Sequence, residues 1–307
     1  MKPLVLARRF SQALSLLVFI YILWSTAYPL AGHIAPGRFF KADPLIMLSA
    51  SISERIVLSG VTASLFMLAM TAVLGRFFCG WVCPLGAAID MAGALNRRRK
   101  SLPDAKNSKY RKLKYYILGV IFLAALFGRQ VAWLFDPIVV MGRFVSLNLI
   151  PSVTYLVNSL FMALIKYMGA GQAVKDFYHL LKPTFLGVKT FYFAHSAMIF
   201  LFSFAIFAGA IALRRSWCRM LCPLGAIYAL AGRLSPLRRS IKKCVDCGRC
   251  KSFCRMGAIR DDLSYVQSEC ILCMDCVYDC PGHATRFGVR LAGQAEVEMD
   301  RRRPKKK

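Results

Sequence analysis

Cys244-Val-Asp-Cys247-Gly-Arg-Cys250-Lys-Ser-Phe-Cys254 and Cys270-Ile-Leu-Cys273-Met-Asp-Cys276-Val-Tyr-Asp-Cys280-Pro281 are two runs with one cysteine spacing, C-x2-C-x2-C-x3-C. The two-residue gaps let successive thiolates converge, because the turning backbone brings each sulfur to the same side. The 307-residue chain has twelve cysteines, and the other four form the pairs Cys79/Cys83 and Cys218/Cys222. Every cysteine therefore belongs to a short motif, and the pattern indicates thiolate chemistry.

This spacing is typical of a bacterial ferredoxin with two [4Fe–4S] clusters, in which three close thiolates hold one cluster and the fourth ligates the other. The crossed rule predicts two ligand sets: Cys244, Cys247, Cys250 and Cys280 for the first cluster, and Cys270, Cys273, Cys276 and Cys254 for the second. The first run ends in Cys254-Arg255 where many ferredoxins have Cys-Pro. Since proline is not a ligand, cluster binding is still expected.

Zinc and disulfide bonds are the alternatives to clusters at these two runs. Zinc also uses Cys-x2-Cys pairs, but a zinc site closes with four ligands and rarely shows two such runs side by side. Disulfides between cysteines this close would form small strained loops. Iron–sulfur clusters, and with them electron transfer, are the favoured prediction.

Most of the remaining chain is apolar, and 57% of all residues are hydrophobic. A helix needs about 20 apolar residues to cross a membrane, and four stretches approach this length: Phe10 to Gly32, Ile56 to Phe78, Leu113 to Phe135 and Phe191 to Leu213. A fifth run, Val153 to Ile165, is expected to be an interfacial helix or part of a loop because it is shorter. The first stretch is expected to be a retained anchor rather than a cleaved signal peptide.

Basic residues predict the orientation of these spans. Lysines and arginines fill the loop after the second span (97–114) and border the fourth, and such loops stay in the cytoplasm. Both termini are therefore expected inside, in a multi-pass protein of the bacterial inner membrane. The net charge of +27 then indicates contact with anionic membrane lipids, and no nucleic acid partner is expected.

An internal repeat organises the membrane part, because Arg76-Phe-Phe-Cys79-Gly-Trp-Val-Cys83-Pro-Leu-Gly matches Arg215-Ser-Trp-Cys218-Arg-Met-Leu-Cys222-Pro-Leu-Gly. The fold class expected is membrane all-α, with four transmembrane helices in two parallel repeats, plus a C-terminal α+β two-cluster ferredoxin domain. The expected boundaries are 1–100 for the first repeat, 101–239 for the second repeat with an outer-face insertion, 240–290 for the ferredoxin domain and 291–307 for a basic tail.

The pairs Cys79/Cys83 and Cys218/Cys222 are candidates for a further metal or redox site. A three-residue gap puts both thiols of a pair on one helix face. If the two pairs meet, they offer four thiolates to a soft metal such as copper(I) or iron, or act as redox-active dithiols. The alternative is that these thiols simply pack as small apolar side chains.

The two Cys-x3-Cys-Pro motifs after paired membrane helices, followed by two ferredoxin runs, resemble the NapH/MauN family of membrane ferredoxin-type proteins. The resemblance covers nearly the whole chain. It implies a quinol-oxidising membrane subunit that passes electrons to a partner redox protein, such as another ferredoxin-type or cytochrome subunit, or to a periplasmic reductase. Alternatives are a maturation factor that reduces or delivers a metal such as copper, and a redox sensor.

Quinol oxidation requires groups that accept protons in a pocket reached from the bilayer. Five polar residues expected near the outer side are candidates: His33, Asp43, Arg129, Asp136 and His195. Each also has an ordinary role, since Asp before Pro caps a turn and a lone arginine reaches the headgroups.

Overall fold

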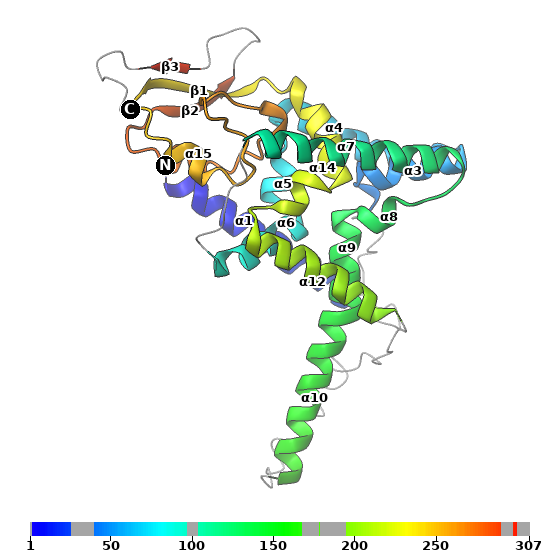
Figure 1. Ribbon diagram of the computed structural model, residues 1–307. Coiled ribbons are helices and arrows are strands. Elements are labelled where there is room, and N and C mark those ends of the chain that lie inside the picture. The colour runs from blue at the N-terminus through cyan, green and yellow to red at the C-terminus, as the bar shows by residue number, and fades with distance from the viewer. Residues whose placement is uncertain are drawn as a thin grey trace.

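The computed structural model describes residues 2–25, 40–96, 104–167, 178, 195–289 and 297–299. His33, the basic tail from residue 300 and much of the expected outer-face insertion lie outside the described residues. Helices dominate residues 2–234, and a small sheet with short helices forms the C-terminal part (Figure 1).

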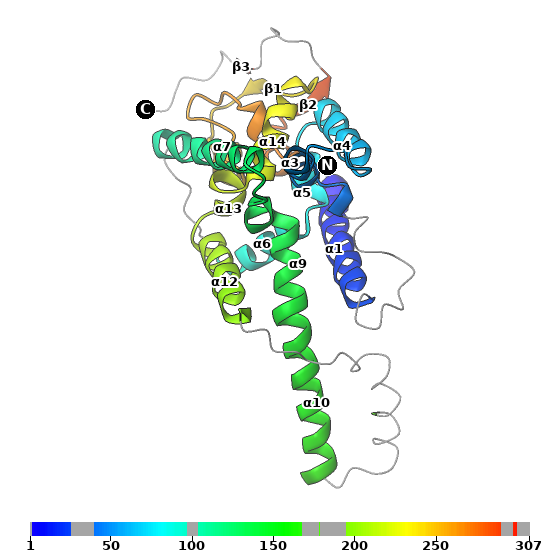
Figure 2. The same cartoon turned by 90° about the vertical axis from the view of Figure 1, so that its right-hand side faces the viewer.

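Two helices of the described part are long and apolar enough to cross a membrane. One is α1 (Lys2–Ser25). The other runs without a break through α9 (Pro137–Phe144), η2 (Val145–Leu149) and α10 (Ile150–Tyr167). Figure 2 shows α1, α9 and α12 (Ser196–Ala212) side by side, directed away from the strands, with α10 projecting beyond them.

The long helix α9–η2–α10 corrects the expectation that Val153 to Ile165 is too short to span. These residues continue a helix that already begins at Pro137. A π-helical turn at Val145–Leu149 lies just before Pro151, where the missing proline N–H removes one backbone hydrogen bond. The turn accommodates this loss without ending the helix, so the apolar run is about twice as long as expected from the sequence.

The remaining helical elements, apart from the 23-residue α7, are shorter than the predicted spans. They are α3 (Pro44–Glu54), α4 (Val61–Leu74), α5 (Phe77–Trp81), α6 (Pro84–Ala92), η1 (Gly93–Leu95), α7 (Asp104–Leu126), α8 (Ala132–Phe135), α13 (Ser216–Met220), α14 (Pro223–Ala231) and η3 (Gly232–Leu234). The third predicted span, Leu113 to Phe135, is divided because α7 ends before Gly128, whose φ of 73° is left-handed.

The two sequence repeats interlock. Helix α6, which follows the first cysteine pair, packs against α1 of its own repeat and against α9 and α12 of the other. Helix α14, which follows the second pair, packs against α7 of its own repeat and against α3 and α4 of the first. The predicted boundary at residue 100 therefore separates the two repeats in the sequence only. In the structure, their helices pack together as one unit.

The C-terminal part contains a three-stranded sheet in the order β2-β1-β3. Strand β1 (Leu237–Cys244) pairs antiparallel with β2 (Thr285–Val289), in the register Leu237 to Val289 and Ile241 to Thr285, and parallel with β3 (Val297–Met299). Between β1 and β2 lie α15 (Arg249–Phe253), η4 (Gln267–Glu269) and α16 (Asp275–Tyr278). The sheet thus brings the start and the end of the predicted ferredoxin domain together.

Buried ion pairs attach this C-terminal part to the helices. Glu269 of η4 accepts hydrogen bonds from Lys114 of α7 at 2.6 Å and from Arg76 at 3.1 Å, and all three side chains are buried. Burial alone favours the neutral acid, but Arg76 and Lys114 hold the pKa of Glu269 below its usual value. Asp275 of α16 similarly binds Arg8 of α1 at 3.4 Å.

We expect Glu269→Ala to destabilise the protein by about 3–5 kcal/mol, because it leaves two buried cations without their anion. Thermal unfolding of the detergent-solubilised protein measures the loss. Asp261→Ala is the matched control, since it breaks the exposed pair between Lys251 and Asp261 and should cost less than about 1 kcal/mol. Equal effects of the two substitutions would contradict the role given to the buried pair.

Candidate functional site

The first predicted ligand set meets at one cavity. Cys244, Cys247, Cys250 and Cys280 all line a small enclosed space beneath β1, together with the buried Arg239. The Nε and Nη2 atoms of Arg239 are buried and have no hydrogen-bond partner. Donors of this kind suit the sulfur atoms of a bound cluster, so the residues present fit a [4Fe–4S] group.

The second predicted ligand set also comes together. Cys254, Cys270 and Cys276 lie within electrostatic range of one another and of Cys273. Burial raises the pKa of Cys270 to about 11 and that of Cys273 to about 12. A buried thiol of this kind becomes a thiolate only when a metal replaces its proton.

The two Cys-x3-Cys pairs, 139 residues apart in the chain, meet as a single group that we call the four-cysteine centre: Cys79, Cys83, Cys218 and Cys222. The thiols of Cys83 and Cys222 occupy equivalent positions, each accepting a hydrogen bond from the backbone N–H of the glycine in Pro-Leu-Gly, at 3.4 and 3.2 Å. The side chains of Cys83, Cys218 and Cys222 are 4–7% exposed. The interlocking of the repeats therefore creates a thiol site that neither repeat has alone.

The four-cysteine centre touches the second ligand set through backbone. A Cβ on Gly80 would collide with the carbonyl oxygen of Ile271, and the indole N–H of Trp81 donates to the carbonyl of Leu272 at 3.1 Å. Gly80 and Trp81 lie between Cys79 and Cys83, and Ile271 and Leu272 lie between Cys270 and Cys273. The two groups of thiols are thus neighbours.

All twelve cysteines are free thiols in the structure. Within the described ranges, no three donor side chains of His, Cys, Asp or Glu converge tightly enough to hold one metal ion.

The four predicted quinol-site residues in the described part of the chain do not form one site. Asp43 and Asp136 are brought together, but both are buried, at 1% and 0% exposure. Each Oδ1 caps a helix, accepting from Leu45 N–H at 2.8 Å and from Ile138 N–H at 2.8 Å respectively. The Oδ2 atoms of both residues are buried and have no hydrogen-bond donor, and the two carboxyl groups lie close enough to interact, so we infer that they share one proton. Burial, and for Asp43 also the neighbouring Asp136, raises the pKa of each acid.

Only His195 of the described candidates lines an apolar pocket. The pocket has a volume of about 440 Å³ and is walled by side chains of α8, α9 and α12, with Arg143 and Ser203 as its other polar members. The Ser203 hydroxyl is buried and has no hydrogen-bond partner. Arg129 is exposed on the segment after α7 and does not line this pocket. The sequence held no signal for Arg143 or Ser203, because their helices meet only in three dimensions.

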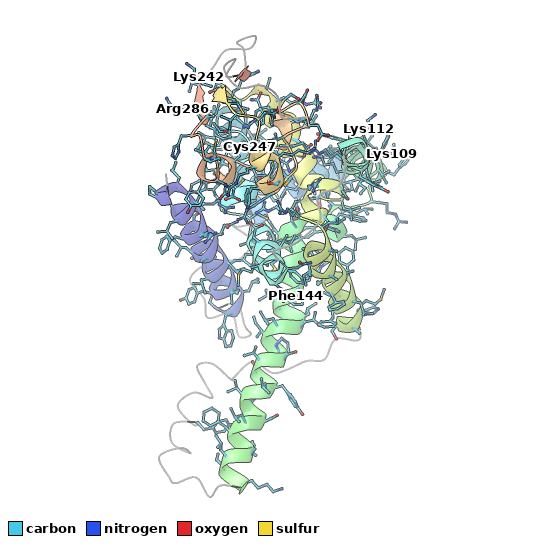
Figure 3. All side chains as sticks on the ribbon, turned by 60° about the vertical axis from the view of Figure 1, so that its left-hand side comes forward. Lys109, Lys112, Phe144, Lys242, Cys247 and Arg286 are labelled. Atoms are coloured by element: carbon cyan, nitrogen blue, oxygen red, sulfur yellow. The ribbon has the colours of Figure 1, made fainter. Side chains whose placement is uncertain are left out.

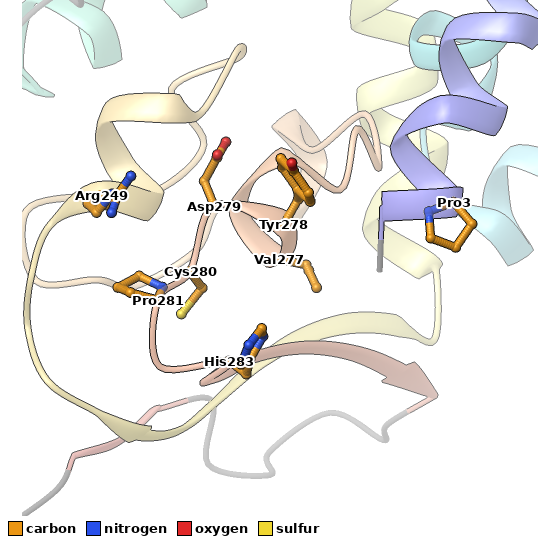
Figure 4. Close-up of a pocket in the computed structure, with 8 residues that line it drawn as sticks. All are labelled: Pro3, Arg249, Val277, Tyr278, Asp279, Cys280, Pro281 and His283. Carbon is orange, nitrogen blue, oxygen red and sulfur yellow. The ribbon is translucent and has the colours of Figure 1, made fainter.

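A second pocket, of about 630 Å³, opens at the surface beside the first ligand set. Figure 4 shows Cys280, Pro281 and His283 on one side of it, and Pro3 at the start of α1 on the other. The N-terminus therefore lies next to the predicted ferredoxin domain.

A protein-family model described as a 4Fe-4S binding domain matches the chain twice, at residues 56–103 and 195–243. The two matches are separated by the same number of residues as Cys79 and Cys218, and so follow the internal repeat. Each contains one Cys-x3-Cys pair, and both end before Cys244. Both halves of the internal repeat are thus similar to an iron–sulfur binding domain.

Relatives define the family further. The chain is 25% identical to the "Ferredoxin-type protein NapH" of Haemophilus influenzae over 94% of the chain and 91% of that protein. It is 27% identical to the "Methylamine utilization ferredoxin-type protein MauN" of Methylorubrum extorquens over 80% and 73%. The resemblance to the NapH and MauN ferredoxin-type proteins is confirmed.

A third relative is larger. The "Putative electron transport protein YccM" of Escherichia coli is 30% identical over 70% of the chain, and the chain spans about half of its length (52%). No solved structure matches the chain.

We expect Asp136→Asn to preserve stability to within about 1 kcal/mol, because asparagine caps a helix and also donates a hydrogen bond to Asp43. Asp136→Ala should cost about 2 kcal/mol or more, since it removes the cap and leaves a buried Asp43 without its partner. Thermal unfolding distinguishes the two variants. Equal losses for Asn and Ala would argue against the shared hydrogen bond.

Proposed function

We propose that the protein is a membrane-bound electron carrier that oxidises quinol and passes the electrons through iron–sulfur centres to a partner redox protein. The observation that carries this proposal is the contact of Gly80 and Trp81 with Ile271 and Leu272. It joins the four-cysteine centre to the second ligand set and so supports one continuous line of thiol sites. Bound [4Fe–4S] clusters supply one-electron transfer at such sites.

The apolar pocket at His195 is the proposed quinol site. Its volume of about 440 Å³ and mostly apolar lining suit a lipid-soluble ring, and His195 is its candidate proton acceptor. Quinol becomes quinone by losing two electrons and two protons, so the site needs both a base and a route for electrons. Phe202 of the pocket packs edge-on against Trp217, with ring centroids 5.6 Å apart, and Trp217 precedes Cys218. These two rings therefore lie between the pocket and Cys218, a predicted ligand.

The proposed ligands follow from the placement of the thiols. Cys244, Cys247, Cys250 and Cys280 would hold one [4Fe–4S] cluster, and Cys254, Cys270, Cys273 and Cys276 a second, while the four-cysteine centre would hold a further metal group. The proposed order from the pocket is the four-cysteine centre, then the second set, then the first set.

We place the protein in the inner membrane with both termini in the cytoplasm. The two long apolar helices support insertion, and the position of Pro3 beside Cys280 supports a common side for the N-terminus and the ferredoxin domain. Electrons would then leave on the cytoplasmic side, where the basic loops border the lipid.

The proposed partner surface surrounds Cys247, which is exposed. Lys242 and Arg286, labelled in Figure 3, are exposed on β1 and β2. They adjoin Ile241 and Thr285, which line the same cavity as Cys247. Positive charge around an exposed redox site steers an acidic partner toward it. A small acidic ferredoxin-type protein or cytochrome domain fits this surface.

Metal delivery is the second candidate function, and the meeting of four thiols from two repeats favours it. Three of these thiols are at most 7% exposed. A site that hands a metal to another protein needs an accessible thiolate. Burial therefore supports a resident group over a transferred one.

Quinol should reduce the iron–sulfur clusters of the anaerobically purified protein, and the measured signal is the loss of their absorbance. His195→Gln is expected to slow this reduction about 100-fold, because it removes the proton acceptor. Arg129→Gln is the control, since Arg129 is exposed outside the pocket, and it should match the unmodified protein. If dithionite reduces the protein but quinol does not, the quinol-oxidising function is wrong.

Electron transfer to an acidic ferredoxin should slow with rising salt, because exposed charges are screened. Reversing the charge of Lys242 and Arg286 together, by K242E and R286E, should lower the rate about 10-fold at low salt. Stopped-flow oxidation of the dithionite-reduced protein measures the rate. K109E with K112E is the control, because these exposed lysines lie on α7, well away from Cys247 (Figure 3). Equal slowing in both double variants would contradict the docking site.

A further inference from the structure

Two equivalent arginines cross between the repeats. Arg76 and Arg215 hold the same place in the repeated motif, three residues before the first cysteine of each pair. Arg215 reaches into the first repeat, where its Nη1 donates to the carbonyl of Cys79 at 2.8 Å and its Nη2 to that of Gly86 at 3.4 Å. Arg76 reaches into the second, where it lies beside Gly225 and Cys222. Each cysteine pair is thus accompanied by the arginine of the opposite repeat.

The repeated glycines make room for these arginines. A Cβ on Gly225 would lie 2.9 Å from Nη2 of Arg76 and 3.4 Å from the sulfur of Cys222. A Cβ on Gly86 would lie 3.6 Å from Nη2 of Arg215 and 3.0 Å from the carbonyl oxygen of Cys79. The glycine of both Pro-Leu-Gly motifs therefore allows a guanidinium to approach the thiols, which accounts for its presence in both repeats.

Both guanidinium groups are only 1% exposed. Asp90 receives two hydrogen bonds from Arg215, at 3.0 and 2.7 Å, while Glu269 receives one from Arg76. The Nε and Nη2 atoms of Arg76 have no partner, although its guanidinium lies beside the sulfurs of Cys79 and Cys222. Arg215 also adopts a left-handed backbone conformation (φ 46°), which costs about 1 kcal/mol for a residue with a side chain. Its side-chain bonds hold it there.

The charges around the centre do not balance. The ion pairs that flank it contain five cations, Arg8, Arg76, Lys114, Arg215 and Arg255, and three carboxylates, Asp90, Glu269 and Asp275. Buried charge without a counter-charge is costly. An oxidised [4Fe–4S] cluster with four thiolates carries two net negative charges, and at this centre it would supply a counter-charge directly beside Arg76 and Arg215.

We propose that Cys79, Cys83, Cys218 and Cys222 hold one additional [4Fe–4S] cluster shared by the two repeats, and that Arg76 and Arg215 are its positioning residues. The proposal rests on the electron-transfer function proposed above and identifies the group at its four-cysteine centre. The two guanidinium groups neutralise the cluster and stabilise its reduced form, since reduction adds one electron and hence one negative charge. The protein then carries three clusters, where the two ferredoxin runs alone predict two.

Iron and acid-labile sulfide of the anaerobically purified full chain test the cluster. We expect about twelve irons and about twelve sulfides per chain, and about eight of each in the double variant C79S and C218S. A wild-type content of about eight, or copper or zinc in stoichiometric amount at these thiols, would overturn the proposal. The wild-type measurement requires no variant to fold.

A redox titration followed by EPR tests the two arginines. Arg76→Gln and Arg215→Gln should each make one of the three clusters about tenfold harder to reduce, equivalent to about 59 mV for one electron. Arg76→Lys keeps the charge and should restore most of the potential, whereas Arg260→Gln, at an exposed position, should change nothing. Full cluster content with unchanged potentials in both glutamine variants would rule out the positioning role. If one glutamine variant fails to fold, the two lysine variants are titrated in its place. Because lysine keeps the positive charge, the cluster potentials of the lysine variants must lie closer to the wild-type value than the potential of the glutamine variant that does fold.

The quinol titration separates this inference from the proposed function. Three clusters that quinol never reduces would support the additional cluster and refute quinol oxidation. A protein with only two clusters, both reduced by quinol, would support quinol oxidation and refute the additional cluster.

Discussion

The reciprocal insertion of Arg76 and Arg215 is the interaction on which the rest of the structure depends. Each arginine leaves one repeat and is buried against the cysteine helix of the other. Burying a guanidinium is costly unless its N–H groups find hydrogen-bond acceptors and its charge finds a counter-charge. The arginines therefore require both repeats to be present and in one relative position, and the same position brings the four thiols together.

The second consequence of these buried cations is the fixed place of the ferredoxin domain. Arg76 and Lys114 share Glu269, and Arg8 and Arg255 share Asp275. Because these carboxylates come from the C-terminal part, the charge that the repeats bury also holds this part against them. Trp81 and Gly80 then meet the backbone between Cys270 and Cys273. Electron transfer weakens steeply with distance, so rigid contact between thiol sites serves a carrier better than a flexible linker does.

Asp43 and Asp136 have a structural role, although the sequence also made them candidates for a quinol site. Asp43 and Asp136 precede proline at the starts of α3 and α9, and each caps its helix. The structure adds that the two capping carboxyl groups lie beside each other and are both buried. They stabilise the junction between the repeats, and His195 is left as the described candidate that faces an apolar pocket.

The sequence by itself determined the parts that depend on local spacing. The two ferredoxin runs, the repeated Arg-x2-Cys-x3-Cys-Pro-Leu-Gly string and the Asp-Pro helix starts are read directly, because neighbouring residues set the direction of each side chain. The sequence does not predict the length of the helix Pro137–Lys166, since a π-turn before Pro151 lets the helix continue where the proline suggests an end. The interlocking of repeats, the partners of Arg76 and Arg215, and the pocket of Arg143 and Ser203 were decided only by tertiary structure. Such contacts join residues that lie far apart in the chain. No local pattern encodes which of these residues meet, or which buried charge lies beside which thiol.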